Sequence, residues 1–398
     1  MKSSPHWIRE QIEVLQASHL KRARRRLTPR QDGWCVLDGH VAQNFASNDY
    51  LGLAGDQRLI DAACQAARDF GIGAGASPLV SGRTDCHAAL EERIARFENA
   101  EACLLFPSGF AANLGVLTAL ADSGDQIFSD QWNHASLIDG CRLSGAQVHV
   151  YRHADPQHLG SLLEQHSQTG RRLIVTDSVF SVDGDVAPLQ EICRLAEAHD
   201  ALLVVDEAHA TGVYGDHGRG LLEALQLESQ VVLKIATLSK ALGAQGGFVV
   251  GDQSLMDWLW NRARSQVFST ALASPVCAAA TAAFDIVEAE PWRRAKLWEL
   301  SRMFVDLLLQ ADLDLGPTPS QDFGPIIPVR LEHPDVAMAA SQMILDDGFL
   351  VGAIRPPSVP VGTSRLRITM SCTHSTDDVA RLAESIVKRV RQASGASQ

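Results

Sequence analysis

A single lysine stands among small and hydroxylated residues in the stretch Thr237-Leu238-Ser239-Lys240-Ala241-Leu242-Gly243. An apolar run, 231–233, precedes this stretch, and the glycine pair Gly246-Gly247 follows it. Burying an unpaired ammonium group is costly, so a lysine in such a pocket either binds an anion or loses its proton and acts as a nucleophile. Both alternatives predict a ligand site around Lys240.

A second candidate site lies upstream, where the apolar run 201–205 leads directly into Asp206-Glu207-Ala208-His209. A buried strand that ends in an acid and a histidine puts both groups where ligands bind in parallel α/β folds. The simpler interpretation of Asp206 alone is that it caps the next turn. Its combination with Lys240 favours a chemical role.

Three further motifs follow apolar runs. The segment 107–113, which contains Ser108-Gly109-Phe110, has the pattern of a strand end turning into a helix. Free N–H groups there would suit a phosphate, although similar turns often serve only as helix caps. Asn133-His134-Ala135-Ser136 puts a histidine at a helix entrance, where an isolated histidine is more often structural. The segment 178–185 contains Ser181.

The elements that would position these motifs are short apolar runs alternating with helical patterns. Candidate strands are 103–106, 126–129, 148–151, 173–176, 202–206, 231–236 and 247–250. This alternation predicts an α/β fold with a mostly parallel, seven-stranded sheet covered by helices on both faces. Ligands of such sheets collect beyond the carboxyl ends of the strands, and the motifs fall there.

The remainder of the chain predicts a long helical segment over roughly 254–312, broken at Glu290-Pro291, and then a smaller α+β domain. Expected elements of that domain are strands at 326–331, 349–354 and 365–370 and helices near 335–347 and 376–391. A proline-rich loop at 354–363 presents one arginine, Arg355.

The N-terminal residues 6–30 show helical spacing and contain a basic cluster: Lys21, Arg22, Arg24, Arg25, Arg26 and Arg30. A solvated helix face is the default interpretation. The alternative is that one or two arginines grip a carboxylate or a phosphate of a ligand. The segment 71–76 matches the dinucleotide fingerprint, but a helical pattern precedes it where a strand is required, so we interpret it as a glycine-rich loop.

The amino-acid composition argues against several classes of protein. The 398 residues are 46% hydrophobic and 21% charged, which is typical of a globular protein and not of a disordered one. A net charge of -12 argues against a nucleic-acid or anionic-membrane partner. The eight cysteines form no C-x-x-C pair, and no apolar leader or membrane-spanning run is present, so we expect a cytoplasmic protein with reduced cysteines.

The motif Asp-Glu-Ala-His also occurs in nucleic-acid helicases, so a helicase is the main alternative function from another class of protein. A helicase needs a G-x-x-x-x-G-K-[ST] loop, and the sequence contains no Gly-Lys pair. A metal site around His209 would lack a helix-spaced ligand pair, so we expect no metal. A pyridoxal phosphate (PLP) site explains more residues: Lys240 would form the Schiff base, Asp206 would pair with the pyridine nitrogen, and hydroxyl and helix N–H groups would hold the phosphate.

Taken together, these motifs resemble the α-oxoamine synthases, PLP enzymes of fold type I. The resemblance covers nearly the whole chain and rests on Ser108-Gly109-Phe110, Asn133-His134-Ala135-Ser136, Asp206-Glu207-Ala208-His209, Thr237-Leu238-Ser239-Lys240-Ala241 and Arg365-Leu366-Arg367-Ile368-Thr369. Within the family, Ala353-Ile354-Arg355-Pro356-Pro357-Ser358-Val359-Pro360 is most similar to the branch that serves biotin synthesis. That branch usually has threonine at the position of Ser358 and often aspartate at that of Glu207.

The resemblance implies a role for each matching residue. It implies that His134 stacks on the cofactor ring and that His209 and Ser181 lie near the phenolic oxygen. Residues implied to hold the cofactor are Ser108, Gly109, Phe110, Glu207, Ala208, Thr237, Leu238 and Ser239, together with Lys240 and Asp206. Residues implied to bind substrate are Asn48, His134, Arg355, Ser358 and Arg22, with Arg25 as the alternative to Arg22.

The implied reaction is the decarboxylative condensation of L-alanine with a pimeloyl thioester of coenzyme A or acyl carrier protein, giving 8-amino-7-oxononanoate. One alternative is the sister reaction of glycine with acetyl-CoA, and another is a catalytically silent binding protein on the same fold. The resemblance also implies a homodimer. We expect an N-terminal helical segment at 1–45, a large PLP-binding domain at 46–285 and a small C-terminal domain at 286–398.

Overall fold

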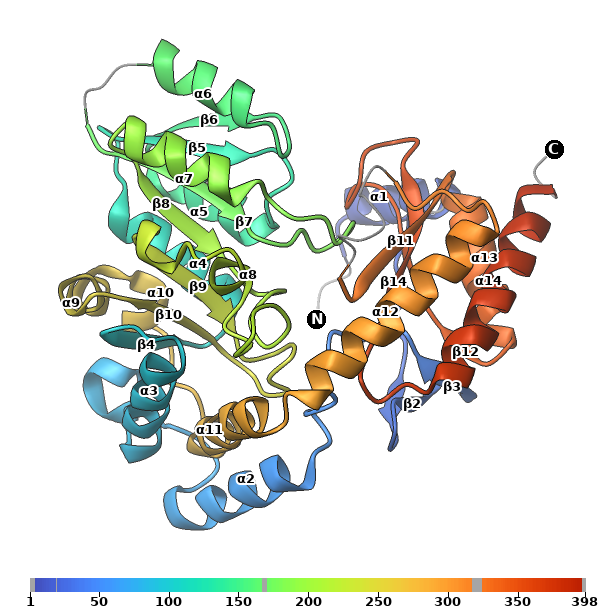
Figure 1. The fold of residues 1–398 in the computed structure, drawn as a ribbon, viewed down its shortest axis with the longest axis horizontal. Helices are drawn as coiled ribbons and strands as arrows, with labels where there is room; N and C mark the ends of the chain where they lie inside the picture. Colours follow the sequence, from blue (N-terminus) through green and yellow to red (C-terminus); the bar gives the residue numbers. More distant parts are fainter. Residues whose placement is uncertain (1–3, 19, 167–169, 317–323, 396–398) are drawn as a thin grey trace. The chain divides into compact units, whose positions relative to one another are not determined.

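The structure is a computed structural model that describes residues 4–18, 20–166, 170–316 and 324–395. The chain divides into two compact units, whose elements are labelled in Figure 1. The larger unit comprises Asn48–Ser181 and Asp185–Lys296. The smaller unit comprises Met1–Ser47, Val182–Gly184 and Leu297–Gln398.

The larger unit is built on a seven-stranded sheet within the described residues. Its strands are β4 (Ala102–Phe106), β5 (Gln126–Asp130), β6 (Gln147–Tyr151), β7 (Arg172–Asp177), β8 (Leu202–Asp206), β9 (Leu233–Thr237) and β10 (Gly247–Gly251). They lie in the order β4-β10-β9-β8-β7-β5-β6, and of these seven β10 runs antiparallel to both of its neighbours. The predicted mostly parallel sheet is confirmed, and each strand overlaps a predicted apolar run.

Helices cover both faces of this sheet. They are α2 (Gln57–Phe70), α3 (Asp85–Phe97), α4 (Gly109–Leu120), α5 (Ala135–Ser144), α6 (Pro156–Gln165), α7 (Leu189–Ala198), α8 (Leu221–Ala224), α9 (Gln253–Arg262), α10 (Arg264–Val267) and α11 (Ser274–Ala289). One buried apolar cluster joins α4, α5 and α9 to alternate residues of the strands. Helices α6 and α7 contact β5, β6 and β8 outside this cluster, so they lie on the opposite face.

Local sequence signals explain where several of these helices begin and end. Side chains that accept a backbone N–H bond cap the helices α2, α4, α5, α6 and α9: Asp56, Ser108, His134, Asp155 and Asp252. Helix α2 ends at Phe70, and Gly71 follows with φ +81°, which glycine tolerates best. The segment 71–76 is therefore a loop after a helix, as predicted.

The smaller unit contains two short sheets and three helices among the described residues. One sheet has the order β1-β2-β3-β12, from Leu27–Pro29, Trp34–Leu37, His40–Asn44 and Phe349–Leu350; the other has the order β11-β14-β13, from Ile326–Glu332, Ser364–Thr369 and Gly352–Ile354. The helices are α1 (His6–Ala17), α13 (Pro334–Asp346) and α14 (Thr376–Gly395); α12 (Trp292–Gln310) crosses the boundary between the units. A buried ion pair between Asp183 and Arg365 holds residues 182–184 within this unit.

Three sequence expectations need correction. The helix over 6–30 is wrong beyond Ala17, because β1 begins at Leu27 and β2 and β3 form a hairpin. Asp38-Gly39 makes its two-residue turn with positive φ at both positions, which is the hairpin turn that this dipeptide favours. The single strand 349–354 is two strands in different sheets, since β12 pairs with β3 and β13 with β14.

The third correction concerns the helical segment 254–312. It is interrupted at Ala263 and again between Val267 and Ser274, in addition to the predicted break at Glu290-Pro291, where α11 ends and α12 begins. Among the helices that the structure describes, none is both long enough and apolar enough to cross a bilayer.

Candidate active site

Three neighbouring strands end in polar residues on the same face of the sheet. Alternation along β7, β8 and β9 puts Leu173, Val175, Val204, Leu233 and Ile235 into the apolar cluster under α4 and α5. The next residues on that face are Asp177, Asp206 and Thr237, each the last residue of its strand. The carboxyl groups of Asp177 and Asp206 and the hydroxyl of Thr237 therefore lie at one edge of the sheet, next to the starts of α4 and α5.

Asp206 is a buried carboxylate with both oxygens bound. Asn113 of α4 donates from Nδ2 to Oδ2 at 2.6 Å, and the Ala208 N–H donates to Oδ1 at 2.8 Å. Asn113 also donates to Ser136 Oγ at 2.8 Å. Donors on both oxygens stabilise the ionised form, which is the form that pairs with a pyridinium nitrogen. Asn113 lies in the motif 107–113, but its role as the partner of Asp206 was not predicted.

His134 precedes α5 and presents an exposed ring. Its backbone N–H donates to Asp177 Oδ2 at 2.7 Å, and its Nδ1 lies 2.7 Å from Ser136 Oγ. Although the residue is exposed, protein atoms crowd its imidazole enough that desolvation lowers the pKa of His134, with the nearby Asp206 raising it and Lys240 lowering it further. The ring is therefore neutral at pH 7, and its face is available for stacking on a planar group.

A buried tyrosine, Tyr50, contacts the imidazole of His209. The Tyr50 hydroxyl lies 2.7 Å from His209 Nδ1, and it also donates to Asn48 Oδ1 at 3.3 Å. This chain of contacts brings the predicted substrate residue Asn48 and the predicted cofactor residue His209 together. Tyr50 was not predicted as a site residue, although it belongs to the Asn/Asp-rich turn after residue 44.

The start of α4 lies against the end of β9. Ser108 Oγ accepts the Ala111 N–H at 3.1 Å, and a Cβ on Gly109 would lie 3.3 Å from Thr237 Cβ. The hydroxyls of Thr237 and Ser239 lie 2.7 Å apart. The start of this twelve-residue helix lies next to the hydroxyls of Thr237 and Ser239, and free N–H groups at a helix start together with hydroxyls suit a phosphate.

Lys240 directly follows Ser239 and lies close to the two aspartates at the strand ends. Its backbone carbonyl accepts the Gly243 N–H at 2.9 Å, which closes a tight turn, and its side chain is half-buried. Lys240 influences the pKa of both His134 and Asp177, so its ammonium lies within electrostatic range of the strand ends. Leu238, its predicted neighbour in the site, is fully buried and donates its N–H to the Gly246 carbonyl at 3.0 Å.

Other predicted cofactor residues have different environments. The Glu207 carboxylate lies 3.2 Å from Lys234 Nζ and accepts the N–H groups of Leu221 and Leu222 at 2.8 and 3.1 Å, so its contacts anchor α8. Burial raises the pKa of Glu207, and Lys234 opposes this shift. Ala208 takes part through its backbone bond to Asp206, and Ser181 is half-buried four residues after Asp177. Phe110 lies edge-on to His134, with 6.4 Å between ring centroids.

In the smaller unit, the predicted substrate residues also form contacts with one another. Arg22 Nη2 donates to Ser358 Oγ at 2.9 Å, and Arg355 Nη2 donates to the Lys21 carbonyl at 3.1 Å. Arg25, the alternative to Arg22, instead donates to Asp38 at 2.8 Å. The N-terminal segment therefore lies against the loop that carries Arg355 and Ser358.

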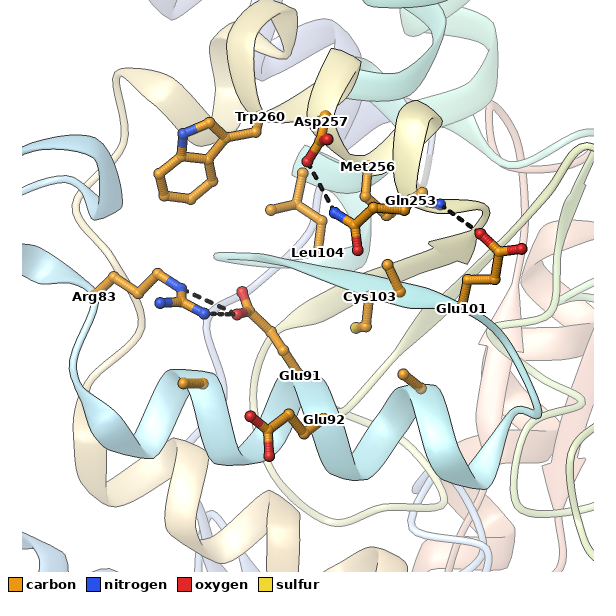
Figure 2. A pocket seen from close by; sticks show the side chains of 13 residues that line it. Arg83, Glu91, Glu92, Glu101, Cys103, Leu104, Gln253, Met256, Asp257 and Trp260 are labelled. Carbon is orange, nitrogen blue, oxygen red and sulfur yellow. Dashed lines mark hydrogen bonds and ion pairs between the residues drawn. The ribbon is translucent and has the colours of Figure 1, made fainter.

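A separate pocket of about 430 Å³ lies between α3, β4 and α9 (Figure 2). Arg83 and Glu91 form an ion pair at 2.7 Å on one side of it, and Trp260 lies on the other. It borders the first residues of β4, whereas Ser108 follows the last, and no predicted site residue lines it. The candidate site is the cluster at the strand ends and not this pocket.

The residues of the strand ends fit PLP. A buried anion with two donors suits the pyridine nitrogen, a neutral exposed imidazole suits the ring face, and the start of α4 with two hydroxyls suits the phosphate. Lys240 would supply the amine that tethers the aldehyde.

Comparisons with known proteins agree with this fit. A family model described as aminotransferase class I and II matches residues 42–386. The 8-amino-7-oxononanoate synthases of Anaeromyxobacter dehalogenans and Geobacter metallireducens are 46% and 44% identical to this chain, covering 94% of it and 92% and 95% of their own lengths.

Solved structures show the same similarity. A serine palmitoyltransferase from S. paucimobilis with bound PLP as its myriocin aldimine superposes with a TM-score of 0.93 at 28% identity, covering 98% of each chain. The 8-amino-7-oxononanoate synthase of Francisella tularensis gives a TM-score of 0.76 at 28% identity over 88% of this chain and 98% of that one. The cofactor is thus PLP, and the chain belongs to the aminotransferase class I and II family, within it to the acyl-transferring α-oxoamine synthases.

Proposed function

We propose that this protein condenses L-alanine with a pimeloyl thioester, releasing carbon dioxide and the thiol carrier and forming 8-amino-7-oxononanoate for biotin synthesis. The observation that carries the proposal is the cluster of Lys240, His134 and Asp206 at neighbouring strand ends, where Asp206 raises and Lys240 lowers the pKa of His134. Similarity to relatives named 8-amino-7-oxononanoate synthase over more than nine-tenths of the chain supports the choice of reaction.

When bound, PLP supplies an electron sink that stabilises negative charge at the α-carbon of an amino acid. Asp206 would pair with the pyridine nitrogen, because its buried carboxyl group is held at the strand end by N–H bonds to both oxygens. Lys240 would hold the cofactor through its amine, and the same amine, when free, would remove the α-proton of alanine. His134 would cover the cofactor ring and exclude water, and His209, whose Nδ1 contacts the Tyr50 hydroxyl, would hold a proton for the phenolic oxygen.

The overall reaction then balances. The α-carbon of alanine forms a bond to the thioester carbonyl carbon, and the thiolate leaves and takes up a proton. The bond between the α-carbon and its carboxylate breaks, carbon dioxide departs, and Lys240 returns a proton to the α-carbon.

Substrate choice is proposed to lie in the smaller unit. Arg355 binds the carboxylate of the amino acid as a bidentate guanidinium clamp. Arg22 and Ser358, which are hydrogen-bonded to each other, contact the acyl chain and its remote carboxylate. Asn48 and His134 complete the substrate contacts. We further propose that the protein works in the cytoplasm as a homodimer. Coenzyme A and acyl carrier protein are the two alternative carriers of the pimeloyl group.

The sister reaction of glycine with acetyl-CoA uses the same catalytic residues, so the assay must compare substrates. Purified protein is offered L-alanine or glycine with pimeloyl-CoA, pimeloyl acyl carrier protein or acetyl-CoA, and thiol release is followed. We expect turnover with alanine and a pimeloyl thioester and at most trace turnover with glycine and acetyl-CoA. Preference for glycine and acetyl-CoA would identify the sister reaction, and no turnover with any pair would favour a binding protein.

Lys240→Ala tests the catalytic assignment. This variant should lose all turnover and the visible absorption band of the bound cofactor, because the tether and the proton carrier are the same amine. A variant that retains both would remove Lys240 from its proposed role.

A further inference from the structure

Asp177 lies beside Asp206 at the end of the neighbouring strand. The two residues pair in the register between β7 and β8, and both face the helices α4 and α5. Asp177 is 4% exposed and Asp206 is 5% exposed. Two carboxyl groups therefore share one water-poor region, where two negative charges side by side are unfavourable.

Hydrogen bonding distinguishes the two acids. Both oxygens of Asp206 accept N–H bonds, from Asn113 and from Ala208. Within the described residues, the side chain of Asp177 receives one such bond, from the backbone N–H of His134 at 2.7 Å. Asp206 therefore has an N–H donor on each carboxylate oxygen, whereas the Asp177 side chain has this one donor.

The surrounding charges favour the same distribution. Burial raises the pKa of Asp177 well above its ordinary value, and the charges of Asp206 and Asp130 raise it further. The His134 amide and Lys240 act in the opposite direction without cancelling this shift. This setting favours the protonated carboxyl group, which still offers its carbonyl oxygen as an acceptor.

Asp177 is also tied to the turn that carries His134. Asn133 Oδ1 accepts the Asp177 N–H at 3.0 Å, and Asn133 Nδ2 donates to the Val175 carbonyl at 2.8 Å. The Asp177 side chain adds the bond to the His134 N–H. Together these contacts fix the residue from which the exposed imidazole projects.

We infer that Asp177 is a protonated positioning residue that fixes the backbone of His134 and leaves the negative charge of the acid pair on Asp206. The inference rests on the proposed roles of Asp206 and His134 toward the cofactor. The two neighbouring aspartates thus have different roles: Asp206 carries the negative charge, and Asp177 fixes the backbone of His134.

Three variants distinguish the charge of Asp206 from the backbone contact made by Asp177: Asp177→Asn, Asp177→Ala and Asp206→Asn. Asparagine reproduces a neutral carboxyl group, since its amide oxygen can accept the His134 N–H. We expect Asp177→Asn to bind PLP within about threefold of the natural protein, with an unchanged visible spectrum. Asp177→Ala and Asp206→Asn should each weaken PLP binding roughly tenfold or more, because a buried acceptor or a fixed charge is lost.

An infrared difference spectrum supplies a direct readout without any substrate. At pH 7, the natural protein minus Asp177→Asn should show the carbonyl band of a protonated carboxylic acid, in both the PLP-free and the PLP-bound forms. A missing band would overturn the inference. So would an Asp177→Asn variant that loses PLP or fails to fold, or an Asp177→Ala variant that binds PLP normally. Neither readout involves alanine or a thioester, so a wrong choice of substrate under the proposed function would leave both results unchanged.

Discussion

Arg22 and Arg25 lie three residues apart and have different partners. Arg22 donates to Ser358 in the proline-rich loop at 2.9 Å, whereas Arg25 pairs with Asp38 in the β2–β3 turn at 2.8 Å. If Arg22 contacts the acyl substrate, Arg22→Ala should raise the KM for the pimeloyl thioester by roughly 10- to 100-fold, the value of one or two charge-assisted hydrogen bonds. The KM for alanine should stay unchanged.

Arg25→Ala is the matched control for this measurement. Its ion pair is solvent-exposed and contributes little to stability, so the variant should fold and keep both KM values. If Arg25→Ala raises the thioester KM and Arg22→Ala does not, the two assignments must be exchanged.

His153 predicts a pH dependence of stability. Its Nδ1 lies 3.0 Å from Asp130 and its Nε2 lies 2.7 Å from Asp185. Burial alone would lower the pKa of this imidazole, but the bonds to the two carboxylates raise it to about 9. Because this value exceeds the ordinary value near 6.5, the stabilisation is complete below about pH 6.5 and is lost as the pH rises through about 9.

His153→Gln tests this pH dependence. Relative to the natural protein it should be destabilised by on the order of 2 kcal/mol more at pH 6 than at pH 10, measured by urea unfolding. The lost stacking of the ring on Trp132 affects both pH values and cancels in the comparison. An equal loss at both pH values would show that the charged form contributes nothing.

At the scale of elements, the turn after Lys240 depends on one glycine. Gly243 has φ +63°, and a Cβ there would lie 2.4 Å from the Ala54 backbone nitrogen. Gly243→Ala must therefore shift the turn or residues 53–54, and we expect a loss of about 2 kcal/mol or more in stability and weaker PLP binding.

Gly55→Ala is the neighbouring control. A Cβ at Gly55 meets nothing within 4 Å, and its φ is not in the left-handed region. This variant should match the natural protein in its thermal midpoint and in its PLP titration. Equal effects of the two substitutions would mean that the close approach at Gly243 does not constrain Lys240.

A buried charge cluster links β9, β8 and the end of α3. Lys234 Nζ lies 2.7 Å from Glu98 and 3.2 Å from Glu207, the residue after Asp206. Burial raises the pKa of Glu98 to about 7 even though Lys234 opposes the shift. Lys234→Met should destabilise the protein by about 3 kcal/mol at pH 8, because two buried carboxylates lose their partner.

The pH dependence of this variant gives the check. At pH 5 the carboxyl groups can take up protons, so the loss measured by urea unfolding should shrink. Lys388→Met, at an exposed position of α14, should be nearly neutral at both pH values. A loss for Lys234→Met that does not depend on pH would point to packing and not to charge.

Across the whole chain, the sequence predicts elements better than contacts. The seven strands of the sheet are apolar runs bounded by turns, and Ser108, His134, Asp206 and Lys240 lie at the ends of such runs or a few residues beyond them. Parallel topology brings strand ends to one edge, so these residues could be expected to meet.

Partners that come from distant parts of the chain could not be predicted in this way. Asn113 bonds Asp206 from 93 residues away, and Tyr50 bonds His209 from 159 residues away. Asp177 was not predicted as a site residue, because only the register of β7 and β8 shows that it lies beside Asp206. The dipeptide Asp38-Gly39, in contrast, favours a hairpin turn by itself, but this turn was not predicted.

The most direct test of the central claim follows both products of one turnover. L-alanine labelled isotopically at its carboxyl carbon is mixed with a pimeloyl thioester and the protein, and free thiol and labelled carbon dioxide are measured together. The proposed reaction predicts equal amounts of the two, with neither formed by Lys240→Ala. Thiol release without labelled carbon dioxide, or no reaction of alanine with either pimeloyl carrier, would contradict the proposed function.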